Sequence, residues 1–152
     1  MSTWWPERKA SRSIPRRSFT AMSNAPERLP LAFDGDPDTR WMSEGRQTGD
    51  EWIRIEFDSP RDVARVRLDM AERSLGDYPR NLVVVSADGD EVRTLYQGSP
   101  LGALMKGLLR EPSRAPMEIA LPANHTKRLV LRQTGQTHVW FWSIHELTLW
   151  ER

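Results

Sequence analysis

The chain has 152 residues, of which 22 are basic and 21 acidic, so its formal net charge at pH 7 is +1. This length suits one domain with a buried core, and the balanced charge argues against electrostatic binding of nucleic acid. Cysteine is absent, which excludes disulfides, zinc-thiolate sites and thiol nucleophiles. No apolar run in the sequence is long enough to cross a bilayer.

The N-terminal segment MSTWWPERKASRSIPRR lacks the apolar stretch of a signal peptide and is rich in basic, serine and proline residues. Such a composition buries too little apolar surface to fold, so we expect residues 1–17 to be a flexible tail or linker and residues 18–152 to form the domain. Trp4 and Trp5 stand beside basic residues, a pairing typical of a membrane–water interface. On that second interpretation, the chain is the soluble end of a larger membrane protein.

From residue 18 onward, short segments alternate apolar and polar residues. In EWIRIEF the apolar residues Ile53, Ile55 and Phe57 share one face, which predicts a strand. The same period recurs in ARVRLDM, EVRTLY, MEIAL, RLVLRQ and IHELTLW, whereas NLVVVSA is apolar throughout and predicts a strand buried on both faces. Asp88-Gly89 is a hairpin signal between two of these strands.

One segment, PLGALMKGLLRE at residues 100–111, has its apolar residues at helical spacing. It contains two glycines, so we expect the helix to be short. Many short strands together with one short helical segment predict an all-β fold, an antiparallel sandwich or jelly roll.

Four blocks occur in order along the chain: AFDGDPDTRW, GDEWIRIEFDSPRDVARVRLD, GDYPRNLVVVSADGD and LVLRQTGQTHVWFWSIHELTLW. Together they resemble the discoidin-like, coagulation-factor type C domains within the galactose-binding-like β-sandwiches. Within this group, the four blocks are most similar to bacterial carbohydrate-binding modules and to domains at the C-termini of membrane-bound glycosyltransferases. The resemblance implies a jelly roll of about eight strands, a structural calcium in many members, and ligand binding by loops at one end.

The acidic loop FDGDPDTRW is where the resemblance implies calcium binding, by Asp34, Asp36 and Thr39, with Glu146 as the distal carboxylate ligand. The residue types suit the ion, because calcium takes six to eight oxygens from carboxylates, hydroxyls and carbonyls. Without a metal, the same residues would form an aspartate-rich turn. In both cases we expect Trp41, which closes the loop, to lie in the core.

Three stretches are expected to form ligand-binding loops: residues 43–51, 71–80 and 132–142. A sugar is recognised by an aromatic face beneath its ring and by polar groups around its hydroxyls. The predicted ligand-binding residues are Arg46, Gln47, Arg73, Asp77, Gln133, His138, Trp140 and Phe141. A structural role is the alternative for each residue, and Trp140 is the best candidate for exposure because it precedes a strand.

We predict no catalytic residues, because the chain has neither a G-x-S-x-G elbow nor a glycine-rich phosphate loop and its three histidines are scattered. The expected function is that of a non-catalytic module, located outside the cytoplasm, that binds a glycan or glycoconjugate. The module is either free or appended to a carbohydrate-active enzyme. The alternatives are a protein- or membrane-surface interaction module and a structural accessory domain of a membrane glycosyltransferase.

Overall fold

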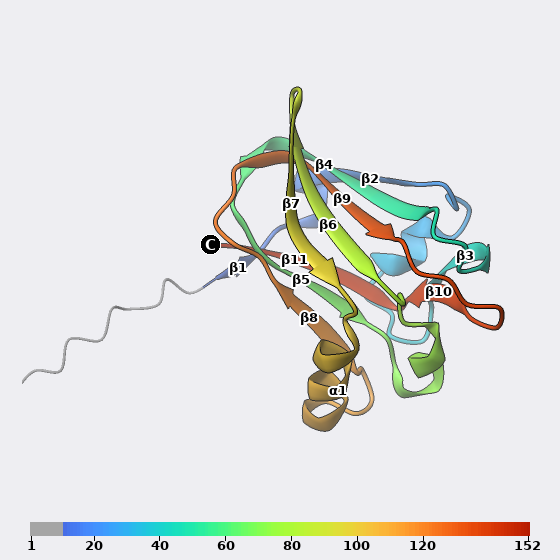
Figure 1. Cartoon of the computed structure of the whole chain (residues 1–152). Coiled ribbons are helices and arrows are strands. Elements are labelled where there is room, and N and C mark those ends of the chain that lie inside the picture. The colour runs from blue at the N-terminus through green and yellow to red at the C-terminus, as the bar shows by residue number, and fades with distance from the viewer. Residues whose placement is uncertain (1–10) are drawn as a thin grey trace, which may run out of the picture.

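The computed structural model describes residues 11–152. Within this range the chain folds into a β-sandwich with one α-helix and three short 3-10 helices (Figure 1). The strands are β1 (Arg12–Ser13), β2 (Phe19–Ser23), β3 (Trp41–Arg46), β4 (Glu51–Arg61), β5 (Val63–Asp69), β6 (Leu82–Asp88), β7 (Glu91–Gly98), β8 (Pro116–Ala120), β9 (Thr126–Gln133), β10 (Phe141–Ile144) and β11 (Glu146–Glu151). The helices are η1 (Arg16–Ser18), η2 (Leu29–Ala32), η3 (Glu72–Asp77) and α1 (Leu101–Arg110). Trp4 and Trp5 lie outside the described residues, so the interfacial interpretation of that segment stays a prediction.

Two main sheets form the sandwich. One sheet has the strand order β2-β4-β9-β6-β7 and the other has the order β1-β11-β5-β8, while β10 pairs with β3 in a small two-stranded sheet. All strand pairs in the described residues are antiparallel. The predicted antiparallel sandwich is therefore confirmed. Residues 11–152 contain eleven strands, rather than about eight, because short strands such as β1 and β10 add to the main sheets.

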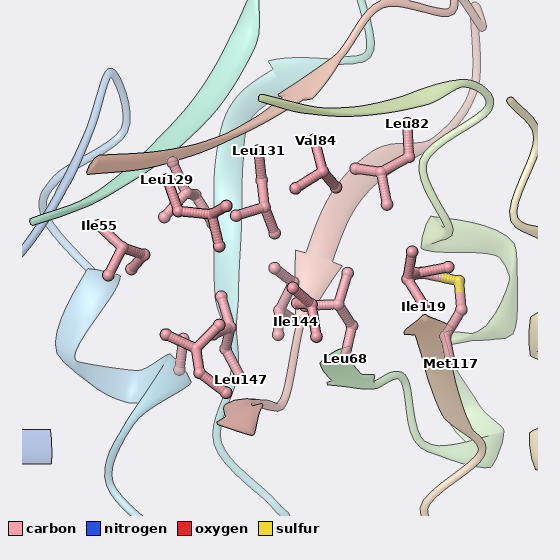
Figure 2. Close-up of a cluster of buried hydrophobic side chains, with 14 of the residues drawn as sticks. Ile55, Leu68, Leu82, Val84, Met117, Ile119, Leu129, Leu131, Ile144 and Leu147 are labelled. Atoms are coloured by element: carbon pink, nitrogen blue, oxygen red, sulfur yellow. The ribbon is translucent and has the colours of Figure 1, made fainter. Parts of the chain in front are cut away.

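The core lies between the inner faces of the two sheets. In Figure 2, Leu82, Val84 and Leu131 of the first sheet point toward Leu68 and Ile119 of the second. All five side chains are buried, as the alternation of apolar and polar residues predicts. Removing this apolar area from water supplies the main driving force for folding.

The expectation that the NLVVVSA strand is buried on both faces is wrong. In β6, Leu82 and Val84 are fully buried, but Val83 and Val85 are only partly buried. The reason is that β6 belongs to a sheet with one face on the core and the other face toward solvent, as is common in antiparallel sandwiches. The hairpin prediction is confirmed, since β6 pairs with β7 and Gly89 has a positive φ of 59°.

Two tryptophans close the core beneath the loops at one end. The rings of Trp41 and Trp142 are fully buried and meet edge to face, with centroids 5.0 Å apart. The indole N–H of Trp41 donates a hydrogen bond to the carbonyl oxygen of Ala25 at 2.8 Å. The predicted core position of Trp41 is confirmed, and its polar atom is satisfied.

The predicted helix is confirmed as α1, which packs on the edge strand β8. Leu104 and Gly107 are its buried residues. Among residues 11–152, no helix has the length and apolar character needed to span a membrane.

The chain enters the sandwich earlier than expected. Arg12 and Ser13 form β1, which pairs with β11. Ile14 is only 5% exposed, belongs to the core cluster, and donates its amide hydrogen bond to the carbonyl of Leu149 at 2.8 Å. The structure therefore packs residues 12–14, which the expected tail included, against the sandwich.

We expect the variant Ile14→Ala to lower the free energy of unfolding by about 2–4 kcal/mol, because it leaves a cavity in the core. The exposed neighbour provides the control: Arg12→Ala should change the stability by less than about 0.5 kcal/mol. Denaturant unfolding of both variants measures the difference. Equal stabilities of the two variants would show that the N-terminal segment is a tail after all.

Candidate functional site

The acidic loop between η2 and β3 is closed by a side chain from the far end of the chain. The amide of Gly35 donates hydrogen bonds to both carboxylate oxygens of Glu146, at 3.3 and 3.2 Å. The hydroxyl of Thr39 donates to the carboxylate of Asp34. The structure thus brings Glu146, from the start of β11, to the loop that contains Asp34 and Thr39. The Asp36 carboxylate accepts the amide of Asp38 at 2.9 Å and supports the turn.

The environment disfavours the charged form of Glu146, the β11 side chain that closes this loop, and favours the charged form of Asp34. Burial raises the pKa of Glu146 to about 7, and the negative charge of Asp34 also raises it, although the hydrogen bond from Gly35 acts in the opposite direction. The hydrogen bond from Thr39 lowers the pKa of Asp34. Within residues 11–152, neither carboxylate forms a salt bridge. A cation at this position would neutralise the pair.

The atoms of this loop that could bind a metal ion are oxygens, which are the ligands that calcium prefers. The described part of the chain contains no group of three or more histidine or acidic side chains arranged around a metal position. A calcium ion here would therefore depend on backbone carbonyls and on the Thr39 hydroxyl as well as on Asp34 and Glu146. This donor set fits calcium better than it fits zinc, which prefers nitrogen and sulfur ligands.

A buried histidine connects the acidic loop to η3. His145 is almost fully buried, and its Nδ1 lies 2.7 Å from the carbonyl oxygen of Pro37, while its Nε2 lies 2.8 Å from the Ser74 hydroxyl. Burial lowers the pKa of His145, which favours the neutral ring. Because a carbonyl can only accept, Nδ1 carries the proton and Nε2 accepts from Ser74. His145 is a structural bridge between the two loops.

Asp77, one of the predicted ligand-binding residues, is a framework residue. Its carboxylate is buried and accepts hydrogen bonds from Arg40 at 3.0 Å and from the Ser143 hydroxyl at 2.8 Å. These bonds tie η3 to the residue before β3 and to β10. The structure thus gives Asp77 a framework role, and its predicted ligand binding stays a prediction.

Gln47 is also a framework residue. Its side-chain amide donates to the carbonyls of Tyr78 and Phe141 at 2.9 and 3.1 Å, and its carbonyl accepts the amide of Arg80 at 3.0 Å. The side chain is buried. All of its hydrogen-bonding groups satisfy backbone groups of neighbouring loops, which is a framework role, and the predicted ligand-binding role of Gln47 stays a prediction.

Gln133 has the same role on the other side of these loops. It is fully buried, its carbonyl accepts the amide of Gly135 at 2.7 Å, and its NH₂ group donates to the carbonyl of Gly135 at 2.8 Å and to Glu51 at 3.2 Å. The predicted ligand-binding role of Gln133 likewise stays a prediction. A polar loop sequence cannot distinguish a glutamine that faces water from one that satisfies buried backbone groups.

Trp140 has the exposure that the sequence predicts, with 44% of its surface accessible. One face of its ring lies on the backbone of Gly76 in η3, where an added Cβ would come within 2.5 Å of ring carbon Cζ3. The Arg80 guanidinium donates a hydrogen bond to the backbone carbonyl of Gly76 at 2.9 Å. The same guanidinium lies over the ring of Tyr78, 3.9 Å from its centroid. Gly76 was not among the predicted ligand-binding residues, because its role depends on a contact with Trp140, 64 positions further along the chain.

The remaining predicted residues lie around this tryptophan. Phe141 is partly buried and pairs with the exposed Arg46 across β10 and β3 (Figure 1), and His138 is exposed in the loop before Trp140. Arg73, exposed on η3, donates to the carbonyl of Asp38 at 2.9 Å and lies 3.3 Å from its carboxylate. Arg46, His138 and Phe141 thus lie beside Trp140, whereas the contacts of Arg73 are with the acidic loop.

A shallow groove continues this surface on the other side of β3. It lies between the loop after β2 and the end of β3, and its lining includes Asn24, Glu44 and Arg46. Glu44 and Arg46 are exposed. The arrangement has an aromatic platform beside a polar groove.

The fold and the sequence identify the family. The family model of the F5/8 type C domain matches residues 18–147. The chain therefore belongs to the F5/8 type C domain family, as the discoidin-like resemblance indicated. The prediction of a discoidin-like domain is confirmed.

Solved structures of family 32 carbohydrate-binding modules share this galactose-binding-like fold. The module of NanJ from C. perfringens, solved in complex with galactose, is 14% identical, with a TM-score of 0.69 over 93% of this chain and 99% of that one. The CBM32-1 and CBM32-2 domains of ZmpB from Clostridium perfringens, solved in complex with GalNAc, are 14% identical, with a TM-score of 0.71 over 92% of this chain and 35% of that one. At this level of identity, the likeness establishes the fold alone.

One relative is an enzyme. The chain is 33% identical over 90 residues to an alpha-(1->3)-arabinofuranosyltransferase from Mycobacterium tuberculosis (strain ATCC 25618 / H37Rv). The match covers 57% of this chain and 6% of the transferase. The chain thus spans a small part of that relative's length.

The framework role of Asp77 leads to a prediction. Asp77→Ala should lower the free energy of unfolding by about 1–3 kcal/mol, because it leaves the Ser143 hydroxyl and the Arg40 guanidinium without their acceptor. Arg73→Ala, on the same 3-10 helix but exposed, should change the stability by less than about 0.5 kcal/mol. Urea unfolding of the two variants tests this. A fully stable Asp77→Ala protein would return Asp77 to the list of candidate ligand-binding residues.

Proposed function

We propose that this chain is a non-catalytic module that binds a glycan at the end of the sandwich that carries β3, β10 and η3. The observation that carries the proposal is the exposed Trp140 ring, fixed by its contact with the backbone of Gly76. An indole face held in this way is a platform for the apolar C–H face of a sugar ring. The galactose and GalNAc complexes of modules with this fold support this choice of ligand class.

The polar side chains around the platform supply hydrogen bonds to sugar hydroxyls. Arg46, Arg73 and His138 are exposed, and arginine in particular offers several donors in a fixed geometry. The buried Gln47 and Asp77 do not reach the ligand but hold the loops in place. Because the loops are already ordered, the protein loses less conformational entropy when it binds.

A structural calcium in the acidic loop is a second part of the proposal. Asp34, Asp36, Thr39 and Glu146 would hold the ion together with backbone carbonyls of the loop. The raised pKa of Glu146, to which the nearby Asp34 carboxylate contributes, supports it. Bound calcium would supply no chemistry to the ligand. It would stabilise the junction between the loop after η2 and the start of β11, which are more than 100 residues apart in the chain.

We further propose that the module acts outside the cytoplasm as an appended domain of a longer carbohydrate-active protein. The match to a small part of an arabinofuranosyltransferase supports this arrangement. In such a protein, the module would hold the enzyme near its polymeric substrate, and the reaction would belong to another domain.

Glycan binding is tested by titrating the chain with galactose, GalNAc and a broad glycan panel. We expect dissociation constants in roughly the micromolar to millimolar range, since a shallow surface buries little area. Trp140→Ala should weaken binding at least about tenfold by removing the platform. Gly76→Ala should also weaken it, because its Cβ would displace the indole ring.

A matched control is Trp150→Ala. Trp150 is partly exposed on β11 and stacks against Arg65 on the face of a sheet, so its loss should leave glycan affinity unchanged. Melting curves of all three variants separate loss of binding from loss of folding. Binding that survives Trp140→Ala, or a panel in which no glycan binds the wild type, contradicts the proposal.

Calcium binding is tested by melting the chain with excess calcium and after treatment with a chelator. The ion binds only the folded state, so its removal should lower the melting temperature. Glu146→Gln should abolish the difference between the two curves, whereas Asp38→Asn, a change at an exposed carboxylate of the same loop, should preserve it. Identical wild-type curves after verified metal removal exclude the calcium site.

A further inference from the structure

Two hollows on the outer side of β3 form one continuous groove. The first, of about 190 Å³, reaches Arg46, and the second, of about 200 Å³, reaches Arg28. They share Ala25, Ser43 and Glu44 as lining residues. The groove therefore runs along β3 from the end of the strand to the loop after β2. We call it the β3 groove.

Hydrogen bonds fix the wall of the β3 groove that the loop after β2 forms. The indole of the buried Trp41 donates to the carbonyl of Ala25 at 2.8 Å and so fastens this loop to β3. The side chain of Asn24 connects the same loop to the start of β4, since it donates to the carbonyl of Asp50 at 3.0 Å and accepts the amide of Trp52 at 3.3 Å. Because the groove is already formed, a ligand that enters it need not order the backbone.

The buried polar groups that line the β3 groove are already used within the protein. The hydroxyl of Ser43 donates to the carbonyl of Gly45 at 2.8 Å and accepts the amide of Trp142 at 3.0 Å. The carboxylate of Glu51 accepts hydrogen bonds from the amide and the hydroxyl of Thr48, at 2.7 and 2.9 Å. A ligand in the groove must therefore be recognised by the exposed side chains at its rim.

Four exposed, charged side chains form that rim: Glu27, Arg28, Glu44 and Arg46. None of the four side chains has a salt bridge or a hydrogen-bond partner within residues 11–152. For the two arginines this is unusual, since most arginines in the same range bind a carboxylate or a carbonyl oxygen. Their guanidinium groups are thus free to bind a ligand.

We propose that the β3 groove is a second sugar-binding subsite, so that the module binds an oligosaccharide that extends from Trp140 toward Arg28 rather than one sugar ring. The inference rests on the proposed function, because it extends the same binding surface. Two carboxylates and two guanidinium groups leave the rim without net charge, which favours an uncharged ligand over a strongly anionic one. A sugar hydroxyl both donates and accepts, so it can bond to either kind of side chain.

The geometry of β3 suits a ligand longer than one ring. Met42, Glu44 and Arg46 lie on the same face of the strand, and the step from the first to the last covers about 13 Å at the usual rise per residue. Half-buried Met42 adds an apolar surface within the groove. The groove meets the platform at Arg46, since the amide of the next residue, Gln47, donates to the carbonyl of Trp140 at 3.0 Å. A sugar chain placed on the platform would therefore continue over Arg46 and Glu44.

The test is titration of the full chain with sugars of increasing length. Galactose, arabinose and mannose are each offered as the monosaccharide and as the linear di-, tri- and tetrasaccharide. In a series that binds, the tetrasaccharide should bind at least about tenfold more tightly than the monosaccharide, because it adds charge-assisted hydrogen bonds in the groove. Arg28→Ala should lower the affinity for the tetrasaccharide about tenfold and leave that for the monosaccharide unchanged. Trp140→Ala should weaken both.

The matched control is Arg17→Ala. Arg17 is exposed in η1, at the opposite end of β2 from the groove, so its loss should leave both affinities unchanged. Melting curves should show that both arginine variants fold, since the changed side chains are exposed. Equal affinity for the monosaccharide and the tetrasaccharide, or an Arg28→Ala protein that keeps the tetrasaccharide affinity, overturns the second subsite while the proposed function stands. A wild type that binds no sugar of any length contradicts both.

Discussion

The loops at one end of the sandwich are ordered because buried polar side chains satisfy their backbone groups. A loop that folds over a core must find partners for its N–H and C=O groups, since unpaired groups shielded from water are costly. Here Gln47 and Gln133 provide those partners with their side-chain amides. Asp77 and His145 extend the same arrangement toward the acidic loop. The exposed residues can form a defined surface only because these four are fixed beneath them.

This dependence explains which features the sequence could reveal. Strands such as β4 and β5 are predictable because one apolar face repeats every second residue, and α1 because its leucines repeat with helical spacing. Strand β1 is two residues long, too short for any periodicity, and it forms only because β11 offers it an edge. Strands β3 and β10 lie next to turn-rich stretches that indicate loops, and their pairing joins residues 95 to 103 positions apart.

In the candidate site, too, some features could be predicted from the sequence and others depend on tertiary contacts. The exposure of Trp140 was predictable from its place before a strand, but the surface on which it rests was not. Gly76 supplies that surface through the absence of a side chain, a property that the sequence near residue 76 gives no reason to single out. A ligand-binding role was also predicted for Gln47 and Asp77 because they are polar residues in loop-like stretches. Their hydrogen-bond partners lie 31 to 94 positions away in the chain. Roles of this kind follow from tertiary contacts and not from local pattern.

The pairing of β1 with β11 has a consequence for how the domain fits into a longer polypeptide. Arg12 lies opposite Glu151 and Ser13 opposite Trp150 in antiparallel register, so the chain enters and leaves the sandwich at the same edge (Figure 1). A domain with adjacent entry and exit points can be inserted into a host protein without forcing the flanking segments apart. Both connections to such a host would then lie on one side of the domain.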